Sequence, residues 1–178
     1  TVFDLRGEGH VVNPADAKHL EAKAVLDAHA YNLSCVYPLL SKNVRATVRI
    51  PSGIAVKGRF SVDGPRYSAT FRARQGGGSL AGNVNFNRGA MAYKANLQAS
   101  RLPLQNFLTQ KGLHPLTGDV NISGWGTDIL SPRTLVKASV NVKHFSYGSY
   151  NLDNITAGTS IRNGLIHAAI NSKNPLLM

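Results

Sequence analysis

Apolar and polar residues alternate with a period of two along almost the whole chain. Successive side chains of a β-strand point to opposite faces, so this alternation predicts strands with one apolar face and one polar face. The pattern is clearest in residues 20–28, 44–50, 56–62, 67–73, 80–86, 91–97 and 116–122. The chain is therefore expected to be mostly β.

Short stretches with turn chemistry separate these strands. Gly64, Gly76 and Gly164 each lie in a run of Asp, Asn, Gly or Pro between two alternating segments. Such residues supply the left-handed backbone positions that tight hairpins need. Strands joined by short loops pair with their sequence neighbours, which predicts an antiparallel meander.

One segment departs from the alternation. Leu104, Phe107 and Leu108 have the i, i+3, i+4 spacing of one helix face. Pro103 suits the first helical turn, and Gly112 suits the position just after the last. The sequence predicts one short helix near residues 102–111.

The chain also resembles itself. The alternating Ala22, Ala24 and Leu26 recur as Ala138, Val140 and Val142, and residues 44–50 match residues 155–161 in the same way. We interpret residues 1–115 as a first β-repeat unit and residues 116–178 as a truncated second unit that continues the same sheet. The chain is then expected to be a piece of a longer, elongated β-structure.

An apolar sheet face must be covered by something. A single two-turn helix is too small to cover about ten strands. A second sheet layer, a closed barrel and a curled, open trough remain as solutions, and the interior of the trough can shelter an apolar guest such as lipid acyl chains. A filled β-sandwich has the same alternation, so a compact module that binds carbohydrate or a protein partner remains an alternative.

The net charge is strongly positive, at +11 from 20 Lys and Arg against 9 Asp and Glu. Such a charge indicates an anionic neighbour, or simply a well-solvated surface. Seven cations are predicted to form a basic stripe on the polar face, namely Arg45, Arg49, Lys57, Arg59, Arg66, Arg72 and Arg74. Tyr67 and Phe71 fall on the opposite face, so this stripe has no stacking platform for nucleic acid.

The residues give no sign of catalysis. Cys35 is the only cysteine, which excludes an internal disulfide and a multi-cysteine metal site. The six histidines have no metal-binding spacing, and the acidic residues are dispersed rather than clustered as in a polysaccharide lyase. We expect no enzyme activity, no catalytic residues, no metal and no cofactor.

Three segments support a family resemblance: RLPLQNFL at residues 101–108, LTGDVNISGWGTD at 116–128 and YGSYNLDNITAGTSIRNG at 147–164. In this order, after a series of alternating strands, they resemble the AsmA-like superfamily. The resemblance is to the periplasmic repeat region of its TamB-type translocation and assembly proteins, and it covers essentially the whole chain.

The resemblance implies a U-shaped β-trough (a β-taco) with an apolar concave face. It also implies a periplasmic protein of Gram-negative bacteria, anchored in the inner membrane by a segment outside these residues. Such proteins are implicated in phospholipid transport to the outer membrane and in outer-membrane biogenesis. In the full-length context, the resemblance implies an outer-membrane BamA-like barrel protein as a partner.

These considerations predict a hydrophobic groove that shields phospholipid acyl chains, and no nucleic-acid binding. Unpaired strands at the two edges of the sheet are also expected to allow edge-to-edge self-association. The groove-lining residues are predicted to be Leu20, Ala22, Leu26, Val44, Val48, Ile50, Val56, Phe60, Val62, Tyr67, Phe71, Leu80, Val84, Phe86, Met91, Tyr93, Leu97, Val120 and Ile122.

Overall fold

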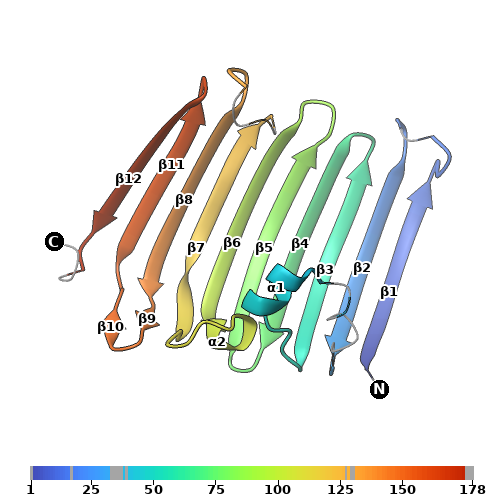
Figure 1. Cartoon of the computed structure of the whole chain (residues 1–178). Coiled ribbons are helices and arrows are strands. Elements are labelled where there is room, and N and C mark those ends of the chain that lie inside the picture. Colours follow the sequence, from blue (N-terminus) through green and yellow to red (C-terminus); the bar gives the residue numbers. More distant parts are fainter. Residues whose placement is uncertain are drawn as a thin grey trace.

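The computed structural model describes residues 2–16, 18–32, 38, 40–126, 128 and 131–174. Within them, ten strands form one antiparallel sheet in which every strand lies beside its sequence neighbour (Figure 1). The strands are β1 (Phe3–Val12), β2 (Glu21–Ala30), β3 (Ile54–Asp63), β4 (Arg66–Gln75), β5 (Gly78–Asn87), β6 (Ala92–Pro103), β7 (Pro115–Trp125), β8 (Leu135–His144), β11 (Ile155–Arg162) and β12 (Leu165–Ser172).

The sheet is not closed into a barrel, because β1 and β12 lie at opposite edges. A small separate hairpin, β9 (Ser146–Tyr147) and β10 (Tyr150–Asn151), lies between β8 and β11. The structure thus confirms the predicted mostly-β antiparallel meander. The strands β6 and β7, on either side of the proposed boundary between repeat units, pair directly.

The predicted turn chemistry is also confirmed. Gly64 has φ +52°, Gly76 has φ +56° and Gly164 has φ +71°, all in the left-handed region. Asn163, with φ +53°, precedes Gly164, so this hairpin has two successive left-handed residues, as a type I′ turn requires. The amide of Gly64 also donates a hydrogen bond to the carbonyl of Leu20 at 2.8 Å, which joins two neighbouring connections.

Strand pairing keeps apolar residues beside apolar residues. Across the middle of the sheet, Leu26 lies opposite Gly58, Gly58 opposite Phe71, Phe71 opposite Gly82 and Gly82 opposite Leu97. The side-chain period of a strand is two, so the rows between these carry the polar residues on the other face. The sheet therefore has an apolar face and a polar face, as the alternation predicts.

Large side chains of the apolar face lean over neighbouring glycines. A Cβ on Gly82 would lie 2.6 Å from Cδ2 of Leu97 and 2.8 Å from Cζ of Phe71. A Cβ on Gly58 would lie 2.9 Å from Cε2 of Phe60. Among the described aliphatic and aromatic residues only Ala99, 8% exposed, is buried. Packing is therefore lateral, between neighbours within one layer, and not between two layers.

Two short helices interrupt the meander, α1 (Lys42–Thr47) and α2 (Leu104–Phe107). The predicted helix near 102–111 is present but shorter, because β6 continues to Pro103. A bulge lies between Ala99 and Leu102, and there the amide of Arg101 donates to Oγ1 of Thr117 at 3.0 Å.

The strand predicted over residues 44–50 is wrong, because this segment contains α1. The Ser41 hydroxyl accepts a hydrogen bond from the amide of Val44 at 3.4 Å and caps the helix. The sheet also has no vacant place for such a strand. β2 already pairs with β3 along their full lengths, from Glu21 opposite Asp63 to Ala30 opposite Ile54.

The close contacts of large side chains with glycines generate a stability prediction. Replacing Gly82 by Ala places a methyl group against Phe71 and Leu97, and we expect the free energy of unfolding in urea to fall by about 1–3 kcal/mol. The matched control is Gly77→Ala in the turn, where an added Cβ meets nothing within 4 Å. That variant should stay within about 0.5 kcal/mol of the wild type. Equal losses for both variants would contradict lateral packing.

Candidate functional site

The apolar face of the sheet is the candidate site, and the structure brings most of its predicted residues together. These residues share one face because they occupy alternate positions along each strand and because directly opposite residues on paired strands point to the same side of the sheet. They are Ala22 and Leu26 on β2; Val56, Phe60 and Val62 on β3; Tyr67 and Phe71 on β4; Leu80, Val84 and Phe86 on β5; Tyr93 and Leu97 on β6; and Val120 and Ile122 on β7.

The face extends further than the sequence predicted. Val140, Ala157 and Ile170 continue the middle row across β8, β11 and β12, and Leu5 belongs to the same face on β1. Alternation is present in these segments too. The signal was weak in β1 because Gly7 and Gly9 occupy two of its apolar-face positions.

Within the described residues, no second sheet layer covers this face. Phe60 is 39% exposed in the third strand, and Ile166 and Ile170 are 69% and 74% exposed at the edge. Neighbouring strands lie about 4.8 Å apart and a ten-residue strand is roughly 33 Å long, so the face is roughly 40 Å wide and 33 Å long. An exposed apolar area of this size on a protein is typical of a binding or interaction site.

Helices α1 and α2 lie near one end of the central strands (Figure 1). We call residues 41–52 and 103–109 the helical cap. The amide of Arg49 donates to the carbonyl of Phe107 at 2.7 Å, and Thr109 donates to the carbonyl of Thr47 through its amide at 3.0 Å and to that of Ala46 through Oγ1 at 2.7 Å. These bonds join two segments about sixty residues apart in sequence, so the cap is one unit.

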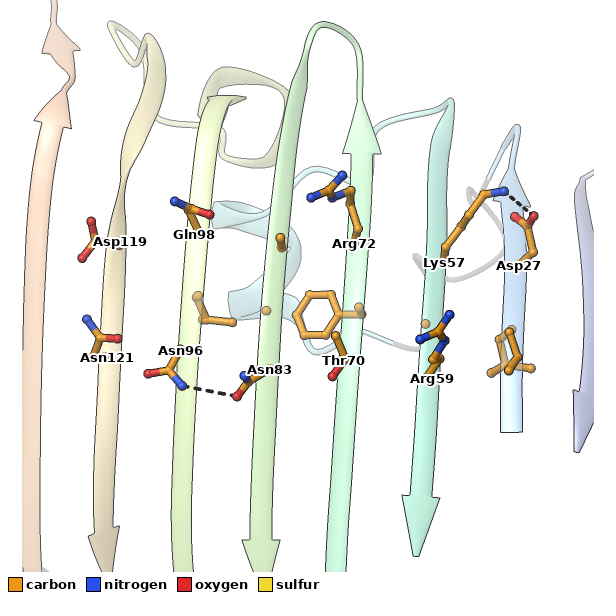
Figure 2. A pocket seen from close by; sticks show the side chains of 17 residues that line it. Asp27, Lys57, Arg59, Thr70, Arg72, Asn83, Asn96, Gln98, Asp119 and Asn121 are labelled. Carbon is orange, nitrogen blue, oxygen red and sulfur yellow. Dashed lines mark hydrogen bonds and ion pairs between the residues drawn. The ribbon is translucent and has the colours of Figure 1, made fainter. Parts of the chain in front are cut away.

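The cap is attached to the sheet by an amide pair. Asn106 of α2 donates through Nδ2 to Oε1 of Gln75 at 2.9 Å. Gln75 lies opposite Ile54 at the end of β4 and shares the apolar face with Phe71 and Tyr67. In Figure 2, which views the polar side chains, both helices lie behind the sheet. The cap is therefore on the apolar side.

Five predicted lining residues lie outside the strands. Val44, 39% exposed, belongs to α1; Val48 forms a bridge with Leu108; and Ile50 follows in the cap. These three were expected to be rungs of a sheet, and that expectation is wrong, because Val44 is helical and the residues that follow α1 bond to residues 107–109 of the cap instead of to a strand of the sheet. Leu20 directly precedes β2, and Met91 occupies the β5–β6 turn with φ +48°.

The polar face carries a surface hollow of about 1090 Å³, shown in Figure 2. Nζ of Lys57 forms an ion pair with Asp27 at 2.8 Å, and Asn96 donates through Nδ2 to Oδ1 of Asn83 at 3.2 Å. The other polar side chains that line the hollow are Arg59, Thr70, Arg72, Gln98, Asp119 and Asn121.

The predicted basic stripe is divided between the two sides of the sheet. Lys57, Arg59, Arg66, Arg72 and Arg74 share the polar face, as expected. The remaining two cations of the stripe, Arg45 and Arg49, belong to the helical cap instead, because residues 44–50 are not a strand.

Aspartates reduce the charge of the polar-face group. Arg66 and Asp63 form an ion pair at 3.6 Å, and Lys57 pairs with Asp27 of the neighbouring strand. The seven cations are therefore not one continuous patch.

The described part of the chain has neither a metal-binding cluster nor a membrane-spanning helix. No three His, Cys, Asp or Glu side chains there are grouped so that they could hold a metal ion. Cys35 lies outside the described residues. No helix among the described residues is long and apolar enough to cross a membrane.

Comparison with known proteins found no matching family model, no matching curated protein and no matching solved structure. The resemblance to the AsmA-like superfamily therefore stays a prediction.

The bond network of the cap generates a second prediction. Replacing Thr109 by Val removes the hydroxyl that bonds to Ala46, and we expect faster hydrogen–deuterium exchange at the amides of Arg49 and Thr109. The control is Thr159→Val, which removes a comparable hydroxyl bond of 3.1 Å to the carbonyl of His167 at the far side of the sheet. It should leave exchange in the cap unchanged. Identical exchange in both variants would show that the two segments do not hold each other.

Proposed function

We propose that this chain is a non-enzymatic lipid-binding protein and that its apolar sheet face shields lipid acyl chains from water. One observation carries the proposal: in-register apolar rows run across all ten strands, and within the described residues no second layer covers them. A face of this kind is unstable in water unless a guest or a partner covers it.

The free energy gained by burying an acyl chain on this face supports an acyl chain as the bound molecule. At about 0.8 kcal/mol per buried methylene, a sixteen-carbon chain gains on the order of 12 kcal/mol when fully covered. A single face covers a chain from one side, so the gain there is smaller. Loss of translational and rotational freedom opposes binding by several kcal/mol. The balance favours weak, exchangeable binding, which suits passage of lipid rather than storage.

The way in which side chains pack on the apolar face supports the same function. Phe71 and Leu97 lean over Gly82, so bulky side chains and glycines fill one another's space instead of forming isolated pockets. Neighbouring rows offer similar chemistry, and the polar atoms among the predicted sheet residues are limited to the hydroxyls of Tyr67 and Tyr93. An acyl chain on this surface meets equivalent contacts as it moves from strand to strand.

The biological setting of the proposal comes from the family resemblance. We propose that the chain is part of a periplasmic protein that is anchored in the inner membrane elsewhere in its sequence. It would carry phospholipid towards the outer membrane and support outer-membrane biogenesis together with a BamA-like barrel. The acyl-chain proposal stands on the apolar face and does not need this setting.

A second candidate is the predicted module for carbohydrate or protein partners. The single layer of strands does not favour the compact sandwich on which that reading was based. The polar face offers a different basis for it, because Asn83, Asn96 and Asn121 occupy adjacent positions on β5, β6 and β7 beside Arg59 and Thr70. Amides in a row suit the hydroxyl groups of a glycan. Capture experiments that compare the two faces separate the candidates.

Crosslinking tests which face holds lipid. A photoreactive amino acid placed at Phe71 or Val84 should capture lipid in cells, because both positions lie on the apolar face. The same amino acid at Thr70 or Asn83 should capture little, because these neighbours point to the polar face. Lipid adducts are identified by mass spectrometry of the purified protein. Equal capture from the two faces, or none from either, would count against the proposal.

A charge on the apolar face should obstruct binding. We expect Val84→Glu to weaken binding of a fluorescent fatty acid about tenfold or more, because burying an unpaired carboxylate beside an acyl chain is costly. Asn83→Asp adds a charge one residue away on the polar face and should leave the affinity within about twofold. Circular dichroism checks that both variants keep the sheet. Weakening of equal size in the two variants would show that the effect is not specific to the face.

A further inference from the structure

We propose that the helical cap binds the phosphate of an anionic phospholipid whose acyl chains lie on the apolar face. This inference rests on the proposed function and adds to it a head-group site, with Arg49 as the principal cation. The ligand class is a glycerophospholipid with a net negative head group, such as phosphatidylglycerol.

The cap forms a hollow where it meets the sheet. Residues from three segments line a space of about 520 Å³, namely Arg49, Ile50, Pro51 and Ser52 after α1, Gln75 at the end of β4, and Asn106 of α2. Gln75 is an apolar-face position, so this hollow adjoins the surface proposed to hold acyl chains. A head group held here keeps its chains on that surface.

The polar groups around this hollow are held in place by one another. Asn106 donates through Nδ2 to Oε1 of Gln75 at 2.9 Å, and Gln75 donates through Nε2 to the carbonyl of Ser52 at 3.3 Å. Each amide nitrogen carries a second N–H. The backbone of Arg49 is fixed by its bond to Phe107. Ordered donors next to a guanidinium group suit a phosphate, which arginine binds through two parallel hydrogen bonds.

The charge of the cap favours an anion. Residues 41–52 contain Lys42, Arg45 and Arg49 and no Asp or Glu. In the part of the chain that the structure describes, no carboxylate lies within ion-pair distance of Arg49. On the polar face, by comparison, Lys57 and Arg66 have aspartate partners. Local cations without acidic neighbours also disfavour the ammonium group of a zwitterionic lipid.

The sheet itself excludes the cations of its polar face from this role. Arg59 and Arg72 project from the polar face, whereas Phe71 and Phe60, their neighbours in sequence, project from the apolar face. A lipid whose chains lie on the apolar side would have to pass its head group through the hydrogen-bonded backbone to reach Arg72. Among the described residues, Arg49 of the cap therefore lies on the side of the acyl chains, whereas Arg59 and Arg72 do not.

The length of the face fits this arrangement. A ten-residue strand runs roughly 33 Å away from the capped end. This is close to the roughly 30 Å hydrocarbon thickness of a bilayer, in which two acyl chains meet end to end. A chain anchored at the cap therefore lies within the length of β3 or β4.

The test compares two arginines on opposite sides of the same sheet. The full chain, purified without detergent, is titrated with three lipids that carry the same oleoyl chain: lysophosphatidylglycerol, lysophosphatidylcholine and monooleoylglycerol, which has no phosphate. Binding is measured by native mass spectrometry and by displacement of a fluorescent fatty acid. We expect the wild type to prefer lysophosphatidylglycerol.

Arg49→Gln should weaken binding of lysophosphatidylglycerol about tenfold. It should leave binding of monooleoylglycerol unchanged, which shows that the variant is folded and its apolar face intact. Arg72→Gln removes the same charge from the polar face and should alter neither affinity. Glycerol phosphate alone should bind far more weakly than the lipid, since it lacks the acyl chain.

The outcomes separate this inference from the proposed function. Equal losses in Arg49→Gln and Arg72→Gln, or a wild type that binds the three lipids equally, would overturn the head-group site and leave acyl-chain binding intact. Glycerol phosphate binding as tightly as the lipid would identify a site for free phosphate instead. If none of the three lipids binds the wild type, the proposed function fails and the head-group site fails with it.

Discussion

In-register pairing of consecutive strands is the constraint on which the rest of the structure depends. A slip of one residue at any hairpin would move every later apolar side chain to the polar face. Left-handed turn residues such as Gly64 and Gly164 set the register locally, and the pairing extends it from β1 to β12. The separation of the two faces depends on the correct register at every hairpin. Every functional proposal depends on that separation.

The same constraint explains how a sheet without a second layer is held together. Its contacts are lateral: the rings of Tyr67 and Phe86 lie 6.1 Å apart on one face, and the hydroxyls of Ser61 and Ser68 are 2.6 Å apart on the other. Cross-strand pairs of this kind each contribute a fraction of a kcal/mol. Stability is therefore distributed along the sheet as in a repeat protein, where each unit contacts only its neighbours.

The sequence predicted those parts of the structure that depend on local pattern. Alternation identified the strands and assigned Phe71, Val84 and Leu97 to one face, because side-chain direction in a strand follows from position alone. It failed at residues 44–50, where four apolar residues in alternation also fit a capped helix. Nothing within that segment reveals that β2 and β3 already pair with each other.

The helical cap could not be predicted for a related reason. It depends on bonds between residues 46–49 and 107–109, and no periodicity within either segment encodes their meeting. The wrong placement of Arg45 and Arg49 in the predicted basic stripe has the same cause. Arg49 was assigned to the polar face by counting along a strand that does not exist, so its separation from Arg72 emerged only with the tertiary structure.

A sheet that is one layer thick also has unusual mechanics. Along the strands it is stiff, because deformation there stretches covalent backbone. Across the strands it is compliant, because bending about an axis parallel to them alters each ladder of hydrogen bonds only slightly. Within the described residues no second layer opposes this bending. The curvature of such a sheet can therefore adjust to bound molecules of different width while its length stays constant. Compliance in one direction and rigidity in the other would let one surface accept molecules that differ in the number and saturation of their hydrocarbon tails.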